Sequence, residues 1–446
     1  MPNVSIRTVA SAAAVLLLTA SLVAQQGRPA AADTWGHWRG PAQTGVAPGA
    51  APVRWSDASN IAWKIEIPGR GHSSPVVWGD RVFVTTAVPT GRKAEPPSAS
   101  GGGRRGDGGA GAHEEHRFDV LALDRATGKI IWRQTAATAV PHEGYHAIYG
   151  SFASNSPTTD GQRLYVSFGS RGLFAYDLNG KMLWQRDFKI QMRMFQEFGE
   201  GVGPVLDEGR LIVLFDHEGD GVLAMLDAAT GSEIWRTPRT DGTNWAAPLV
   251  VRHGGRKQIV VNSPRKVRAY DYETGKQIWE TAGLGLNTIP RAVQHGDSVL
   301  VMSGFINPRL MAIRLGREGD LAGTDAIKWT ATRALAYTTS PVLYEGKLYF
   351  LTDNGMASAI DADSGAPVYQ QVRLPKPYAI KASPVVAGGM LYFPTEDGDV
   401  VVAKVGPTLD VVATNTLTDQ SFVASPAVAA GDIFLRSRTH LFRIHE

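Results

Sequence analysis

Short apolar runs separated by turn residues recur along most of the chain. The clearest copy has a proline-led strand at 203–205, a second strand at 211–215 and a third at 222–227. A Thr-Gly turn follows, and then a fourth strand that contains Trp235. Short runs rich in branched and aromatic residues, bounded by turn residues, predict β-strands joined as antiparallel hairpins. Each copy therefore predicts one four-stranded antiparallel unit.

The unit occurs eight times, and each copy opens with a proline. These prolines are Pro75, Pro157, Pro204, Pro248, Pro290, Pro341, Pro384 and Pro426. From Pro157 onward they stand 42 to 51 residues apart, which suits four short strands and their turns. A chain of 446 residues would otherwise suggest several domains, but repeat units pack only on their neighbours. The sequence thus predicts an all-β, eight-bladed β-propeller of four-stranded antiparallel blades, with seven blades as the alternative.

Three residue types hold fixed places in the unit. Third strands end in Asp124, Asp177, Asp227, Asp271 and Asp361, and the turn glycines are Gly128, Gly180, Gly231, Gly275 and Gly365. Asp accepts hydrogen bonds from a turn backbone and Gly adopts the left-handed conformation, so each pair is expected to close a hairpin. Outer strands carry Trp132, Trp184, Trp235, Trp279 and Trp329, with Tyr369 in a sixth copy. An indole there is expected to wedge between adjacent blades.

The two ends of the repeat array complement one another. The last copy ends at Ile444 without a Trp strand, whereas an extra Trp strand at 60–65 precedes the first copy. We expect this N-terminal strand to complete the eighth blade, because that closes the ring and covers an exposed strand edge.

One motif carries a family resemblance. Residues 123–129 read Leu-Asp-Arg-Ala-Thr-Gly-Lys, and with Trp132 they resemble the repeat of the pyrroloquinoline quinone (PQQ)-binding-like propellers. Quinoprotein dehydrogenases and BamB-like assembly factors share that repeat, and the leader at 35–41 is more similar to that of the BamB-like exported proteins. The repeat implies a fold rather than a function, because it describes how blades pack. We expect residues 33–446 to form one PQQ-like propeller domain.

Residues 1–32 are expected to be a secretory signal peptide and a short linker. Arg7 precedes an almost wholly apolar run at 9–24, which is short for a membrane span. Cleavage is expected after Ala24 or Ala32, with an uncleaved N-terminal anchor as the alternative. The chain has no cysteine, and therefore no disulfide and no Cys for lipidation after the signal. These features predict a periplasmic or secreted protein with no transmembrane domain after signal cleavage.

Charge narrows the range of partners. The chain has 45 basic and 42 acidic residues, a net charge of +3, and no clustered basic face of the kind that nucleic-acid binding needs. We therefore expect no nucleic-acid partner. The protein is also expected to be a monomer. The glycine-rich stretch 90–117 predicts a flexible insertion in the first copy.

Candidate metal ligands occur in two connections. One face of the propeller, called the top face, is expected to carry the crossings between blades and the turns between second and third strands. His142, Glu143 and His146 match the zinc-protease pattern H-E-x-x-H, but the surrounding proline and glycines leave no helix to present them. Together with Asp216, His217 and Glu218, they are candidates for a divalent-metal cluster on this face. The alternative is a hydrogen-bonded network of loops.

The resemblance to quinoproteins implies a second candidate site, for PQQ and Ca²⁺, at the mouth of the central channel. By residue type and repeat position, Glu200 and Asn244 resemble the Ca²⁺ pair, and Lys381 or Arg291 the cation on the quinone oxygens. Asn287 falls where the base would stand, and an amide cannot accept the proton. A vicinal cysteine pair and long insertions are also missing. The alternative is a set of polar residues that line a wet channel.

Two classes of function follow from these patterns. The first is an exported, non-catalytic propeller that presents its top face and channel mouth to a protein or polymer partner. The second is a periplasmic oxidoreductase of the quinoprotein type, dependent on PQQ with Ca²⁺ or on another metal. We favour the first, because no complete catalytic constellation is found. A glycan lyase or hydrolase is a third class, for which no adjacent carboxylate pair can be assigned.

Overall fold

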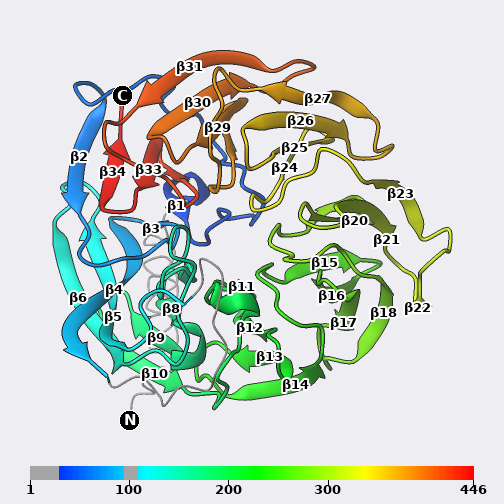
Figure 1. Ribbon diagram of the computed structural model, residues 1–446, viewed down its shortest axis with the longest axis horizontal. Helices are drawn as coiled ribbons and strands as arrows, with labels where there is room; N and C mark the ends of the chain where they lie inside the picture. The colour runs from blue at the N-terminus through cyan, green and yellow to red at the C-terminus, as the bar shows by residue number, and fades with distance from the viewer. Residues whose placement is uncertain (1–29, 95–108) are drawn as a thin grey trace, which may run out of the picture.

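The computed structural model describes residues 30–94 and 109–446. These residues form 34 strands and three 3₁₀ helices, η1 (Ala31–Asp33), η2 (Gly169–Arg171) and η3 (Phe195–Glu197). The strands form eight sheets arranged as blades around a central axis (Figure 1), and all neighbours within them are antiparallel except β22, which pairs parallel with β18. The prediction of an eight-bladed, all-β propeller is confirmed. No helix within the described ranges combines the length and apolarity needed to span a bilayer.

Each blade is a meander of four strands, which follow one another from the channel outward. Blade 1 contains β3 (Val76–Trp78), β4 (Arg81–Lys93), β5 (Glu114–Asp124) and β6 (Ile130–Ala139). Blade 2 contains β7 (Thr158–Thr159), β8 (Arg163–Ser167), β9 (Leu173–Asp177) and β10 (Met182–Arg186). Blade 3 contains β11 (Val205–Asp207), β12 (Arg210–Phe215), β13 (Gly221–Asp227) and β14 (Glu233–Arg239). Blade 4 contains β15 (Leu249–His253), β16 (Arg256–Val261), β17 (Lys266–Asp271) and β18 (Gln277–Ala282).

The second half of the ring repeats this order. Blade 5 contains β19 (Val293–His295), β20 (Ser298–Ser303), β21 (Arg309–Arg314) and β23 (Ile327–Ala331), and β22 (Gly319–Asp320) joins the edge of blade 4. Blade 6 contains β24 (Val342–Tyr344), β25 (Lys347–Leu351), β26 (Met356–Asp361) and β27 (Pro367–Arg373). Blade 7 contains β28 (Val385–Ala387), β29 (Met390–Pro394), β30 (Asp399–Lys404) and β31 (Asp410–Thr416). Blade 8 contains β32 (Ala427–Ala429), β33 (Asp432–Arg436), β34 (His440–Ile444) and β2 (Ile61–Glu66).

Burial follows position within the blade. Every residue of β20, a second strand, is buried, because blades pack on both of its faces. The fourth strand β14 instead alternates exposed and partly buried residues, because only one of its faces meets a neighbour. The continuous apolar runs and the alternating Trp strands of the sequence correspond to these two environments.

Two sequence boundaries differ from expectation. Seven opening prolines directly precede an innermost strand, but in blade 5 β19 begins at Val293, so Pro290 stands two residues too early. The flexible insertion predicted at 90–117 is also too wide, because β4 continues to Lys93 and β5 starts at Glu114. These strand ends pair, with Lys93 opposite Glu114 and Pro89 opposite His116. The central part of that insertion, 95–108, lies outside the described residues.

Neighbouring blades are joined by a repeated contact between an indole and a turn. Trp132 Nε1 donates to the Leu178 carbonyl at 3.0 Å and Trp184 Nε1 to the Ala228 carbonyl at 3.2 Å; each acceptor follows the Asp that ends a third strand. The turn glycine packs directly beneath the indole of the preceding blade. A Cβ on Gly231, whose φ is +72°, would lie 2.7 Å from the Trp184 ring. The indole therefore wedges between blades as expected, and the glycine is required both by backbone conformation and by this contact.

A belt of serine hydroxyls joins the innermost strands near their top ends. Five backbone amides donate to a hydroxyl of the following blade, at 2.9 to 3.1 Å. In order around the ring, these bonds are Arg291 N to Ser340 Oγ, Ser340 N to Ser383 Oγ, Ser383 N to Ser425 Oγ, Ser425 N to Ser74 Oγ and Ser74 N to Ser156 Oγ. At the equivalent positions of blades 3 and 4, Gly203 and Ala247 have no hydroxyl. The belt therefore links blades 5, 6, 7, 8, 1 and 2 only.

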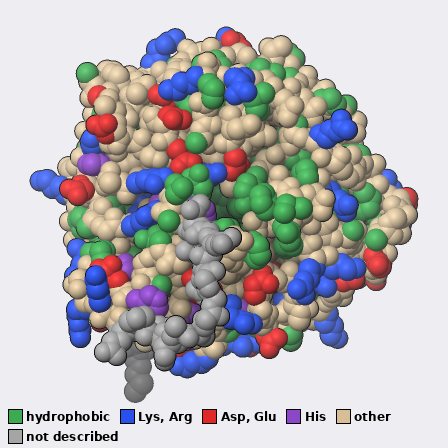
Figure 2. All heavy atoms as spheres, in the orientation of Figure 1, with side chains coloured by type: hydrophobic (Ala, Val, Ile, Leu, Met, Phe, Trp, Pro, Cys, Tyr) green, Lys and Arg blue, Asp and Glu red, His purple; other side chains and the backbone are tan. Residues whose placement is uncertain are grey.

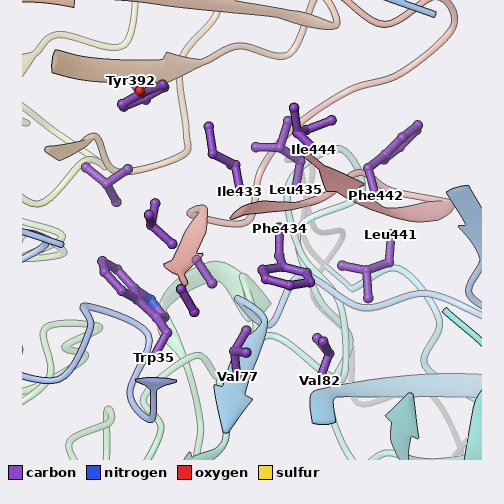
Figure 3. Packing of buried hydrophobic residues seen from close by; sticks show 14 of the residues in the cluster. Trp35, Val77, Val82, Tyr392, Ile433, Phe434, Leu435, Leu441, Phe442 and Ile444 are labelled. Carbon is purple, nitrogen blue, oxygen red and sulfur yellow. The ribbon is translucent and has the colours of Figure 1, made fainter. Parts of the chain in front are cut away.

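Residues from both ends of the chain build blade 8. Strand β2 pairs antiparallel with β34, with Trp63 opposite Arg443 and Glu66 opposite His440. At this seam one apolar cluster combines side chains from blades 7, 8 and 1 with Trp35 of the leader (Figure 3). Trp35 and Phe434 are both fully buried there. The seam is thus closed by strand pairing and by a shared core.

The leader, from here on residues 34–46, continues from the seam into the central channel, where the dark blue segment lies near the centre of Figure 1. Strand β1 (Thr34–Trp35) pairs with β3 of blade 1, and Val46 bridges Val386 of blade 7. Between them, Arg39 donates to the carbonyls of Pro341 and Pro384 at 3.1 and 2.7 Å. Innermost strands have a free edge, so these carbonyls lack a partner within the sheet, and the guanidinium supplies one.

Candidate functional site

The first trio of proposed metal ligands holds a backbone segment instead of converging on a point. His142 Nε2 lies 2.8 Å from the Met192 carbonyl, and the Glu143 carboxylate accepts the Met194 amide at 2.9 Å. Burial and the guanidinium of Arg171 lower the pKa of His142. His146 accepts two amides of its own loop on Nδ1 and stacks on Tyr149.

Two residues of the second trio, His217 and Glu218, hold the same segment from the other side. Asp216 forms a fully buried ion pair with Arg239 at 2.7 Å. His217 Nδ1 accepts the Arg193 amide at 3.2 Å. Glu218 accepts the amide and hydroxyl of Thr243, whose hydroxyl in turn accepts the Phe195 amide. Four of the six candidate ligands thus anchor residues 192–195, whereas His146 bonds its own loop and Asp216 pairs with Arg239. No three His, Asp or Glu side chains in the described parts of the chain are arranged to hold a metal ion.

Glu200 and Asn244, proposed as the Ca²⁺ pair, are already engaged by other groups. Glu200 accepts the amide and hydroxyl of Ser170 at 2.6 and 2.5 Å, and burial raises the pKa of its carboxyl to about 7. Asn244 donates to Asp216 at 3.2 Å and accepts the Ala246 amide at 2.9 Å. The two cavities lined by Glu200 have volumes of about 10 and 30 Å³, one of them also lined by Asn244. These spaces suit one or two water molecules, whereas a cofactor needs several hundred Å³.

The remaining quinone candidates are dispersed. Asn287 Nδ2 donates to the Tyr337 hydroxyl at 3.1 Å. Arg291 is buried and binds Gln43 of the leader, with 2.6 Å from NH2 to Gln43 Oε1. Lys381 pairs with Asp353 at 2.6 Å. This arrangement does not fit a quinone with Ca²⁺, so the PQQ site stays a prediction without support from the geometry.

Part of the channel mouth is covered by the crossing from blade 1 to blade 2, which the sequence did not predict. The crossing from blade 1 to blade 2 folds over the mouth, where the Tyr149 carbonyl meets His72 Nδ1 at 2.8 Å. The Tyr149 ring lies 4.4 Å from Nζ of Lys381, which belongs to the distant blade 7. The leader lies in the channel, and this crossing covers the part of its mouth between blades 1 and 7.

An apolar patch stands beside this mouth. Leu286, Phe305 and Ile306 are 46, 40 and 52 % exposed, and Phe305 stacks on Tyr337 with ring centroids 4.9 Å apart. All four belong to the crossings and the second-to-third-strand turn of blade 5, and thus to the top face. Figure 2 shows hydrophobic side chains gathered beside the central hollow, over blades 4 and 5. The sequence signal for this patch was the turn Gly-Phe-Ile-Asn-Pro, where polar residues would be usual.

The eight four-stranded blades and their Asp-Gly turns define a PQQ-like repeat propeller. The family model described as outer membrane protein assembly factor BamB matches residues 87–188, 116–319 and 173–405. The chain belongs to this family.

Curated relatives agree with that placement. The outer membrane protein assembly factor BamB of Yersinia pestis is 24 % identical over 267 residues, 56 % of this chain and 61 % of the relative. The BamB of Moranella endobia is 24 % identical over 277 residues, 57 % of this chain and 63 % of the relative. The matches therefore span less than two thirds of each relative.

Solved structures share the fold. BamB from Moraxella catarrhalis superposes with a TM-score of 0.53 at 13 % identity, covering 81 % of this chain and 97 % of that one. Quinohemoprotein alcohol dehydrogenase from Comamonas testosteroni gives 0.60 at 12 % identity, covering 93 % and 80 %. An assembly factor and an oxidoreductase thus share this architecture, so the fold by itself decides neither function.

Proposed function

We propose that this protein is an exported scaffold that binds a protein partner through its top face. The observation that carries the proposal is the exposed apolar patch of Leu286, Phe305 and Ile306 beside the channel mouth. Solvent-exposed apolar patches on a monomer mark interaction sites, and aromatic residues are enriched among the anchors of interfaces. The packing of Phe305 on Tyr337 orders part of the patch before binding, which lowers the conformational entropy that binding costs.

The curated relatives suggest the kind of partner. Their names describe assembly factors of outer membrane proteins, and we extend this role to the present chain. The partner would then be a protein of outer membrane assembly, met in the periplasm, in keeping with the expected signal peptide. A quinoprotein oxidoreductase is supported by fold similarity alone, since no group of residues in the described chain fits its cofactor.

Site-specific photo-crosslinking in cells tests this proposal. A photoreactive amino acid replaces Ile306, and the matched control carries it at Ile131, which is 45 % exposed on the outer strand of blade 1. We expect one discrete adduct from position 306, identified by mass spectrometry as an outer membrane assembly protein, and none from position 131. Phe305→Asp should reduce the adduct at least tenfold without changing the melting temperature. Equal adducts from both positions, or none, would contradict the proposal.

A further inference from the structure

His72 stands at the channel mouth with one ring nitrogen unmatched. Its side chain is 7 % exposed, and Nδ1 lies 2.8 Å from the Tyr149 carbonyl. A carbonyl only accepts, so Nδ1 carries the proton and Nε2 presents a lone pair. That Nε2 is buried and has no hydrogen-bond partner among the described residues. A buried acceptor of this kind costs about 1–3 kcal/mol unless a donor reaches it.

Arg436 lies against the same stretch of backbone without a carboxylate. Its side chain is 2 % exposed, and its NH1 donates to the Ser73 carbonyl at 3.1 Å and to the Ser73 hydroxyl at 2.5 Å. A Cβ on Gly71 would collide with its NH2, so the guanidinium extends along residues 71–73. No described Asp or Glu pairs with it, whereas the equally buried Arg239 pairs with both Asp216 and Asp241. A buried charge without a counter-ion is costly in free energy, so a bound anion would stabilise Arg436.

Arg438 adds a second unmatched donor to this corner. Its NH2 pairs with Glu396 at 2.9 Å, but its Nε is buried and has no partner in the described chain. Burial lowers the pKa of the His72 imidazole to about 3, and the charges of Arg70, Arg436 and Arg438 act in the same direction. The charges that act on His72 are therefore all positive. Arg70 itself donates to the carbonyls of Ala147 and Ile148. The corner therefore combines excess positive charge, free guanidinium donors and one free imidazole acceptor.

We propose that His72, Arg436 and Arg438 form a binding site for a small oxyanion that also carries a hydroxyl, with hydrogen phosphate as the type. The anionic oxygens would accept from the two guanidinium groups, which suit phosphate oxygens in charge and geometry. The phosphate hydroxyl would donate to Nε2 of neutral His72. Sulfate lacks this hydroxyl and so leaves the imidazole acceptor unmatched. The site is distinct from the apolar patch and goes beyond the proposed scaffold role.

The cover over the site sets the size of its ligand. Tyr149 lies over the mouth between His72 and Lys381, within the crossing that Arg70 fastens by its two carbonyl bonds. Inorganic phosphate is the smallest ligand of this chemistry and would displace the crossing least, whereas a bulky phosphate ester would have to move it aside. The same chemistry could reach the site as a free ion or as a phosphomonoester, and the two are compared directly in the test.

Isothermal titration calorimetry on the mature protein, at pH 7.5 and constant ionic strength, is the primary test. We expect one saturable site for phosphate and at least tenfold weaker binding of sulfate and of glycerol phosphate. Arg438→Gln and His72→Gln should each weaken phosphate at least tenfold. The matched control Arg265→Gln, an exposed arginine on the top face of blade 4, should bind like the parent protein. If glycerol phosphate binds more tightly than inorganic phosphate, the ligand is a phosphate ester and the site itself is retained.

Several results would overturn the proposal. One is a parent protein that shows no saturable phosphate binding. Another is equal binding in Arg438→Gln, His72→Gln and Arg265→Gln, each shown to be folded by circular dichroism. Sulfate equal to phosphate at pH 7.5 would remove the role assigned to the hydroxyl. As pH falls toward 5, sulfate should gain on phosphate, because a bound anion offsets Arg70, Arg436 and Arg438 and favours protonation of His72. Burial raises the pKa of Glu396, so its pairing with Arg438 weakens over the same range, which frees Arg438 for either anion; Lys381 and Asp353 are the next charges outward.

Discussion

Glu200 shows how a single residue can be mistaken for a ligand. Its carboxylate and its position shortly before an opening proline predicted a ligand for Ca²⁺. In the structure, the Glu200 carboxylate instead accepts two hydrogen bonds from Ser170. Burial raises the pKa of this carboxyl to about 7, and the neighbouring Glu143 acts in the same direction. The residue is thus a buried acid within the top-face network.

This pKa gives stability a pH dependence. The folded state holds a proton on Glu200 between about pH 4.5 and 7 that the unfolded chain releases, so the free energy of unfolding falls as pH rises through this window. We expect Glu200→Gln to remove about 2 kcal/mol of that fall, measured by urea unfolding at pH 5 and 8. The exposed Glu345→Gln should keep the parental slope. An unchanged slope in Glu200→Gln would show that its proton is not coupled to folding.

At the scale of the element, the joint between blades is a strand meeting a turn. The Trp of one outer strand reaches past its own sheet to the hairpin of the next blade. Local sequence predicts the hairpin, because Asp and Gly suit the turn backbone. The contact with the neighbouring indole is a second reason for the same glycine. The joint should therefore be more sensitive to substitution of this glycine than an ordinary turn is.

Two glycines of blade 3 separate these demands. Gly231 has φ +72° and faces Trp184 at 2.7 Å, whereas Gly209 has φ +76° and nothing within 4 Å of a Cβ. We expect Gly209→Ala to lower the free energy of unfolding by about 1 kcal/mol, the cost of the left-handed conformation. Gly231→Ala should cost about 1–3 kcal/mol more, from overpacking against the indole. Equal losses in the free energy of urea unfolding would mean that the Trp184 indole moves aside at no cost.

At the scale of the whole molecule, the leader acts as a second closure of the ring. The paired β2 strand fastens the outside of blade 8, and the leader fastens the inside, from β3 of blade 1 to Val386 of blade 7. Both lie at the seam where the chain begins and ends its circuit. Ring closure therefore rests on residues outside the eight repeats.

Trp35→Ala tests the inner closure. Trp35 is fully buried at the seam, and its removal should lower the free energy of unfolding by about 3–5 kcal/mol. Hydrogen exchange should accelerate first in β3 and β28, because the leader holds these two strands. Trp38→Ala, at a partly exposed position of the same leader, is the matched control and should cost much less. Similar losses for both variants would contradict a specific role for Trp35.

The sequence predicted the blades well and the mouth poorly, and the reason is physical. Strand order, the Asp-Gly turns and the wedging tryptophans depend on patterns within one copy, so they could be derived from the repeats. The cover of the channel depends on contacts between remote segments, such as Tyr149 with Lys381 and Gln43 with Arg291. No period in the sequence encodes those pairs. Residue type alone therefore suggested metal and quinone ligands where the structure has anchors for loops.

The interrupted serine belt gives the ring an uneven mechanical design. Six blades are joined hydroxyl to amide at the hub. Blades 3 and 4 are held there by other bonds, because Gln43 of the leader donates to the Leu206 carbonyl of blade 3 and Arg291 donates to the Pro248 carbonyl of blade 4. The same side of the ring carries the long crossing from β10 to β11 and the smaller of the two cavities. The circle is thus fastened in two ways: by repeated hydroxyl bonds over most of its circumference, and by the side chains of Gln43 and Arg291 over the remaining arc, away from the seam where the chain ends meet.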